Sequence, residues 1–149
     1  EPVDSVALQF SVTVQDPEYR DFSGASLANS GNQVRRIPRV MIRAVPSIEF
    51  ANGRGRAFLA VSHFGQRYAN DENTIKLPPY LKLDAGVEYA FTENWTAQLN
   101  VDNLSNEVGL TEGNPRTDVG ASGVGQVYNA RTLFGRSLAL AVRYKFQPG

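Results

Sequence analysis

Residues 81–102 read LKLDAGVEYAFTENWTAQLNVD, and apolar and polar residues alternate along most of this segment. A period of two is typical of a β-strand with one apolar face and one polar face. The alternation is interrupted at Thr92-Glu93-Asn94, a short polar stretch that suits a tight turn. The segment therefore predicts two antiparallel strands joined by a short connection.

The same alternation occurs elsewhere in the chain and predicts six strands in total. They cover residues 6–14, 40–50, 56–66, 81–91, 95–102 and 137–146, the third with apolar residues on both faces. A second tight turn at 51–55 contains Asn52-Gly53, a pair that readily adopts positive φ. The other connections (16–38, 67–79 and 104–135) are long and rich in Gly, Ser, Asn and Pro. Because short and long connections alternate, an up-and-down meander would place all short turns at one end.

The composition narrows the possible functions. The 149 residues include 15 Lys+Arg and 15 Asp+Glu, so there is no basic excess to hold a nucleic acid. Cysteine is absent, which excludes a disulfide scaffold, a zinc knuckle and a thiol nucleophile. His63 is the only histidine, so a multi-histidine metal site within this chain is excluded. Because His63 shares a side with Leu59 and Val61, we expect it to be a packing or interfacial residue.

The chain also lacks a recognisable catalytic pattern. No Ser-His-Asp set has convincing spacing, and the glycine pairs at 53/55 and 123/125 are too short for a phosphate loop. We therefore expect no catalytic residue, no metal ligand and no cofactor, and we do not expect an enzyme.

Two architectures produce such strands: a soluble barrel or sandwich with the apolar face inside, and a transmembrane β-barrel with that face toward lipid. No stretch approaches the ~20 consecutive apolar residues of a membrane helix. Strands of about eleven residues, rising roughly 3.3 Å per residue and tilted by about 45°, cover about 25 Å, the height of a lipid-facing band. Soluble strands more often have about five or six residues. Strand length therefore favours the transmembrane barrel.

Aromatic residues near the short-turn end point to the same architecture. They are Phe50, Phe91, Trp95, Tyr144 and Phe146. A girdle of this kind marks a membrane–water interface. The final strand closes with Tyr144-x-Phe146, which resembles the C-terminal insertion signal of bacterial outer-membrane proteins, with residues 147–149 following it.

Several motifs follow one another in a characteristic order. They are DPEYRDF at 16–22, RIP at 36–38, FGQRYAND at 64–71 followed by Asn73, LPPYLKLDAGVEYAF at 77–91, NW at 94–95, NVDNLSN at 100–106, and the closing strand from Arg136 to Phe146. Across essentially the whole chain they resemble the C-terminal barrel of TonB-dependent outer-membrane receptors. The resemblance implies an all-β, antiparallel up-and-down transmembrane β-barrel, of which this chain supplies about six C-terminal strands.

Such barrels have about 22 strands around a plugged lumen. Six strands cannot close in lipid, because the edge strands would leave backbone groups unpaired. We therefore expect residues 1–149 to be the C-terminal part of a larger receptor. The plug domain, the signal peptide and the earlier strands would lie outside this chain.

The resemblance also implies a function and a set of partners. Receptors of this family bind a scarce nutrient, most often a ferric siderophore and sometimes cobalamin or a carbohydrate, and import it with energy from the TonB complex. The implied partners are TonB (through the plug), outer-membrane lipid and lipopolysaccharide, the siderophore and the barrel-assembly machinery. The complete barrel is expected to be a monomer in the bacterial outer membrane.

The long loops would then be external and contribute to nutrient capture. Arg and Tyr suit anionic, aromatic chelates, and the candidate contacts are Tyr19, Arg20, Arg35, Arg36, Arg67, Tyr68, Tyr128 and Arg131. The alternative is that each is a solvated loop residue. Other motif residues have architectural explanations: a bulge or close approach at Gly65, a loop end at Pro78-Pro79, and Asx turns at Asp102 and Asn103.

The polar faces of the strands would line the lumen. Lys82, Asp84, Glu88 and Arg143 are expected there, paired with one another or with the plug. Two alternatives stay open from the residues alone. One is a soluble β-barrel module that binds a small ligand in an apolar interior, and the other is a barrel fragment completed by another chain.

Overall fold

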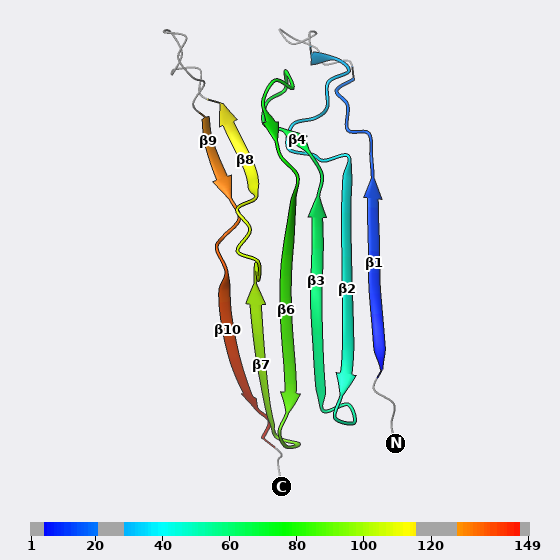
Figure 1. Ribbon diagram of the computed structural model, residues 1–149, viewed down its shortest axis with the longest axis vertical. Coiled ribbons are helices and arrows are strands. Elements are labelled where there is room, and N and C mark those ends of the chain that lie inside the picture. The colour runs from blue at the N-terminus through cyan, green and yellow to red at the C-terminus, as the bar shows by residue number, and fades with distance from the viewer. Residues whose placement is uncertain (1–4, 21–28, 116–127, 147–149) are drawn as a thin grey trace.

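The fold is one antiparallel sheet of six long strands, seen in a computed structural model that describes residues 5–20, 29–115 and 128–146. The strand order is β1-β2-β3-β6-β7-β10, an up-and-down meander (Figure 1). The strands are β1 (Val6–Val14), β2 (Val40–Phe50), β3 (Gly55–Phe64), β6 (Tyr80–Ala90), β7 (Trp95–Asp102) and β10 (Ser137–Tyr144). The predicted six strands and their connectivity are confirmed, but β10 ends at Tyr144, two residues before the predicted end of the last strand.

Two short strand pairs lie within the long loops and were not predicted. β4 (Arg67–Tyr68) pairs with β5 (Lys76–Leu77), and β8 (Leu110–Pro115) pairs with β9 (Tyr128–Thr132). The third strand was predicted to run to residue 66, but β3 ends at Phe64, two residues earlier. Gly65 marks the break: its amide donates to the Val40 carbonyl at 2.9 Å, and a Cβ at Gly65 would lie 2.8 Å from that oxygen. Asp21, Phe22, the glycines at 123 and 125, and residues 147–149 lie outside the described residues.

All short turns lie at one end of the sheet and the long loops at the other, as predicted (Figure 1). In the β2–β3 turn, Ala51, Asn52 and Gly53 have φ angles of 53°, 59° and 79°. The β6–β7 turn is closed by the Phe91 amide, which donates to the Trp95 carbonyl at 3.0 Å. Asn52-Gly53 therefore adopts the positive φ angles that were predicted for the first turn.

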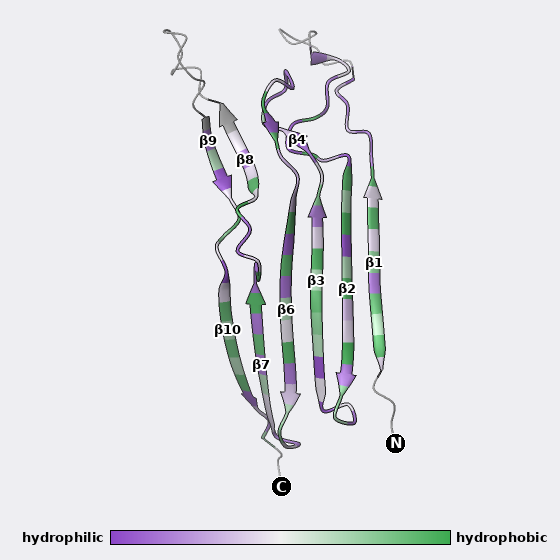
Figure 2. Ribbon diagram, viewed as in Figure 1, coloured by the Kyte–Doolittle hydropathy of each residue, from purple (hydrophilic) through white to green (hydrophobic). Residues whose placement is uncertain are grey.

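The strand register aligns side chains in continuous rows across the sheet. One row crosses all six strands and is entirely apolar: Val6, Ile48, Ala57, Val87, Leu99 and Leu140. The next row along the strands lies on the opposite face and reads Glu49, Arg56, Glu88, Gln98 and Ala141. Figure 2 shows the same alternation as bands along the strands. The sheet therefore has one apolar and one polar face.

The sheet has almost no core of its own. Among the described residues the buried apolar side chains are Ala60, Ala69, Leu77 and Tyr80, and most of these lie at the long-loop end. By contrast, the apolar side chains of β1 and β10 are exposed, Leu140 by 71%. Water-soluble domains rarely expose an apolar surface of this extent. Within the described parts of the chain, no helix has the length and apolar character needed to cross a membrane.

The sheet is also open. Among the described residues, β1 pairs only with β2 and β10 only with β7. In hydrocarbon the outer backbone groups of both edge strands would each cost several kcal/mol unless further strands paired with them. The sheet is therefore built as a segment of a larger closed structure.

Candidate functional site

Two long loops dock against each other above the sheet, and Asp71 lies at the centre of the contact. The Tyr19 hydroxyl donates to Asp71 Oδ1 at 2.7 Å. Arg35 Nε lies 3.4 Å from the same oxygen, and Asn32 Nδ2 donates to the Asp71 carbonyl at 2.9 Å. Burial and the hydrogen bond to Asp71 raise the pKa of the Tyr19 hydroxyl, so that it remains protonated and continues to donate.

The side-chain amide of Asn73 forms the second connection between these loops, through two hydrogen bonds with the Gln33 backbone. Asn73 Nδ2 donates to the Gln33 carbonyl at 2.8 Å, and the Gln33 amide donates to Asn73 Oδ1, also at 2.8 Å. Asn73 has a φ of 54°, a conformation that Asn tolerates better than most residues. Asn70 braces the same loop internally, because its Oδ1 accepts from the Ile75 amide at 3.0 Å. The residues of these two loops therefore form one unit.

Arg67 lies beneath this unit and connects it to the next loop. Its side chain is only 3% exposed, and its guanidinium donates to the Leu110 carbonyl at the start of β8. The guanidinium also lies 5.1 Å from the centre of the Tyr80 ring. Burial lowers the Arg67 pKa from its ordinary value. Gly109 completes the contact, since a Cβ there would lie 2.5 Å from the Tyr80 ring.

The predicted ligand contacts fall into groups in the structure. Tyr19, Arg35, Arg36 and Tyr68 come from the two docked loops, and the Arg36 amide (φ 66°) donates to the Tyr68 carbonyl at 2.7 Å. Arg20 and Arg131 are exposed, and Arg131 lies across the β8–β9 pair from Glu112, with its Nη1 3.8 Å from Glu112 Oε2. Tyr128 begins β9. Arg67 is buried under the loops rather than exposed on them.

Sequence reasoning missed Asp71, Asn73 and Asn32 as organising residues. Asp71 and Asn73 do stand in the motif at 64–73, but nothing local in the sequence shows that they contact residues 52 and 40 positions away. A cluster of Asn and Asp in a long loop is the one available signal, because these side chains often bond backbone groups.

Asn103 holds the loop that follows β7. It is fully buried, and its Nδ2 donates to the carbonyls of Glu107 at 2.9 Å and Phe134 at 2.8 Å. Its Oδ1 accepts from the Glu107 amide at 2.8 Å, so the expected architectural role is confirmed. Asp102 differs from the expected Asx turn, because its carboxylate accepts from Lys82 Nζ at 2.6 Å.

The polar face carries charged residues in the positions expected of a lumen wall. Lys82 Nζ also lies 2.9 Å from Asp84 Oδ1, and Asp84 in turn accepts from the Asn103 amide at 2.9 Å. Glu88 and Arg143 lie on the same face nearer the short turns and flank a shallow depression together with Gln98. Pairing among the charges is therefore confirmed for Lys82 and Asp84.

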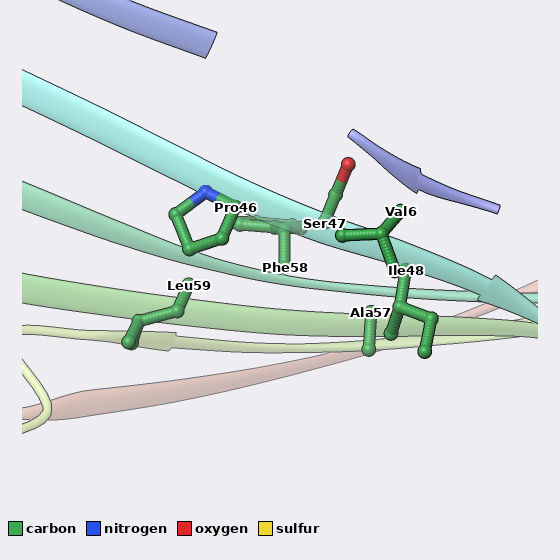
Figure 3. A pocket seen from close by; sticks show the side chains of 7 residues that line it. All are labelled: Val6, Pro46, Ser47, Ile48, Ala57, Phe58 and Leu59. Carbon is green, nitrogen blue, oxygen red and sulfur yellow. The ribbon is translucent and has the colours of Figure 1, made fainter. Parts of the chain in front are cut away.

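The apolar face has the features of a lipid-facing surface. A depression on it lies over β1, β2 and β3 and is lined by Val6, Pro46, Ser47, Ile48, Ala57, Phe58 and Leu59 (Figure 3). His63 lies on this face opposite Ile42 and Leu81, as expected of a packing or interfacial residue. In the described parts of the chain, no three His, Cys, Asp or Glu side chains cluster as metal ligands would.

An aromatic belt marks the short-turn end. Trp95 and Tyr144 lie with ring centres 4.7 Å apart, and Tyr144 and Phe146 are also 4.7 Å apart. Tyr89, which was not predicted as a member, stacks with Phe50 at 6.1 Å and meets Phe91 edge-on at 5.2 Å. The belt, the apolar face and the polar wall together define a segment of a transmembrane β-barrel.

Comparison with known proteins identifies which barrel this is. The chain belongs to the TonB-dependent receptor-like β-barrel family, whose profile matches residues 5–104. Receptors of this family are bacterial outer-membrane proteins, so the sheet described here lies in the outer membrane. This assignment decides against a soluble module with an apolar interior.

One curated relative and two solved structures show how much of a receptor the chain represents. It is 31% identical over 115 residues to the ferrichrome receptor FcuA of Yersinia enterocolitica, which covers 72% of this chain and 14% of FcuA. It matches the siderophore receptor PiuA of Acinetobacter baumannii with a TM-score of 0.71 and 21% identity, over 98% of this chain and 20% of PiuA. The ferric preacinetobactin receptor BauA of the same organism matches with a TM-score of 0.72 and 23% identity, over 97% and 20%. The chain thus spans about one seventh to one fifth of these proteins.

Proposed function

We propose that this chain is part of a receptor that captures a ferric siderophore at its external loops and imports it with energy supplied by TonB. The observation that carries the proposal is the docked pair of loops, bearing Arg and Tyr, on the wall of a TonB-dependent receptor barrel. The names of FcuA, PiuA and BauA support a siderophore as the nutrient. We assign the chain no catalytic step, because binding and translocation require none.

Residues 1–149 supply the C-terminal strands of the barrel in this proposal. β1 pairs with a preceding strand and β10 with the first strand of the barrel, which removes both open edges. The plug that contacts TonB fills the lumen against the polar face. Tyr144 and Phe146 serve the barrel-assembly machinery as an insertion signal, lipid and lipopolysaccharide cover the outer face, and the complete receptor is a monomer.

The eight candidate residues contribute to capture in different ways. Arg20, Arg35 and Arg131 are exposed and can reach an anionic chelate directly. Tyr19, Arg36 and Tyr68 shape the docked loops between them, and Tyr128 lies at the start of β9. Arg67 is buried, so its contribution is to hold β8 under the loops.

The proposal is tested by iron uptake through the full-length protein. It is expressed in a bacterium that lacks its own siderophore receptors, and uptake of radioactive iron is measured with ferrichrome and with a ferric tris-catecholate. We expect uptake of at least one chelate, and we expect that uptake to be lost when TonB is deleted. Absence of uptake for every ferric siderophore, with the receptor present in the outer membrane, would contradict the proposal.

A further inference from the structure

Among the exposed arginines on the long loops, Arg35 is the one that pairs with Asp71, at the centre of the contact between the two docked loops. Its Nε lies 3.4 Å from Asp71 Oδ1, yet the side chain is 52% exposed. In the described parts of the chain, no other hydrogen bond or ion pair uses its two terminal amino groups. Arg35 thus combines a side chain restrained at Nε with two further amino groups that can donate, an arrangement that suits bidentate recognition of an anion.

The carboxylate that holds Arg35 is itself anchored. Asp71 accepts the Tyr19 hydroxyl at 2.7 Å, and its carbonyl accepts from Asn32 Nδ2 at 2.9 Å. The side chains of Tyr19 and Arg35 therefore meet at the same oxygen of Asp71, which links them into one group.

The ion pair does little for stability. Both partners are partly exposed, at 52% and 28%, and exposed pairs contribute little to the free energy of unfolding. Its effect is to reduce the number of orientations of a long and flexible side chain. Fixing such a side chain before the ligand arrives lowers the entropic cost of binding.

We propose that Asp71 is a positioning residue that presents Arg35 to the anionic part of a ferric chelate. The proposal rests on the function proposed above and adds a residue that acts through another rather than on the ligand. It also predicts that Asp71 strengthens the binding of an anion, although its own charge is negative. A carboxylate near an anion-binding site would weaken binding by repulsion, whereas a positioning carboxylate strengthens it.

The sign of the effect provides the test. The full-length receptor is purified, and the Kd of a ferric tris-catecholate, which is anionic, and of ferrichrome, which is neutral, is measured by fluorescence quenching. Asp71→Asn keeps an acceptor for Tyr19 but removes the ion pair with Arg35. We expect its Kd for the anionic chelate to rise about fivefold and its Kd for ferrichrome to stay unchanged.

Two further variants separate positioning from charge. In an Arg35→Ala background, Asp71→Asn is expected to have no further effect on the anionic chelate, because Asp71 acts through Arg35. Asp16→Asn removes the same charge from another exposed pair, with Arg39 at 3.2 Å, and is expected to leave both affinities unchanged.

Each contrary result has a separate meaning. An equal or lower Kd in Asp71→Asn, or an undiminished effect of this substitution without Arg35, overturns the positioning role and leaves the proposed function standing. A wild-type receptor that binds only the neutral chelate also overturns the positioning role and leaves the proposed function standing. A wild-type receptor that binds no ferric chelate overturns both.

Discussion

Replacing Asn103 by alanine is expected to release the loop that follows β7. The side chain is fully buried and makes hydrogen bonds to the Glu107 carbonyl, the Phe134 carbonyl and the Glu107 amide. At about 1 kcal/mol net for each bond, the substitution removes about 3 kcal/mol. The φ of 51° is unfavourable for alanine and adds about 1 kcal/mol. We expect the free energy of local opening to fall by about 4 kcal/mol in total.

Hydrogen exchange of the full-length receptor in detergent measures this opening directly. A fall of about 4 kcal/mol corresponds to roughly thousandfold faster exchange in peptides covering 104–110 and 133–136. The upper limit is the exchange rate of an unprotected amide. Asn103→Gly loses the same bonds but tolerates the φ, so its exchange should be roughly fivefold slower than that of Asn103→Ala. Asn100→Ala is the control, because Asn100 accepts a single long bond from Gln98 at 3.4 Å. Wild-type exchange rates in Asn103→Ala, or equal acceleration in the control, would refute the reasoning.

Three other perturbations test the sheet and the loops. Gly86→Ala places a Cβ 2.4 Å from the Phe58 ring and 2.7 Å from Asn100 Oδ1, and should destabilise the folded barrel by about 1–3 kcal/mol in urea titrations. Phe58→Ala in the same protein should relieve the ring's part of this clash, and no relief would contradict the contact. Because the pKa of the Tyr19 hydroxyl is raised in the folded protein, its stabilising contribution is complete below pH 10 and is lost as the pH rises through the folded-state pKa. Limited proteolysis of the two docked loops should therefore accelerate at alkaline pH. Tyr19→Phe should abolish that acceleration. Leu99→Arg on the apolar face should cost about 2–4 kcal/mol in lipid vesicles, whereas Asn100→Arg on the polar face should cost much less; equal costs would refute the assignment of the faces.

The strands could be predicted because their determinants are local. Alternation along each strand decides which face each side chain occupies, and the turns around Asn52-Gly53 and Asn94 leave one practical way to connect neighbours. Once the strands pair as neighbours with short turns, the register follows and the apolar rows align. The aromatic belt could be placed for the same reason, although Tyr89 was passed over because it lies inside its strand.

The loop structure could not be predicted because it depends on contacts between distant segments. β4 and β5 have two residues each, too few for any periodicity to be visible. Arg67 was taken for an exposed contact because arginine in a loop usually is exposed, and only the approach of β8 and Tyr80 buries it. The role of Asp71 depends on Tyr19 and Arg35, which approach it only after both loops have folded.

In the proposed receptor the two docked loops are external, which has a consequence for antibodies raised against the cell surface. A peptide covering 15–37 or 67–77 alone would lose the bonds from Tyr19 to Asp71 and from Asn73 to Gln33, and with them the shape of the outer surface. Antibodies to either peptide should therefore bind the intact cell poorly. An immunogen that displays this surface needs both loops together, held at the spacing set by the strands beneath them.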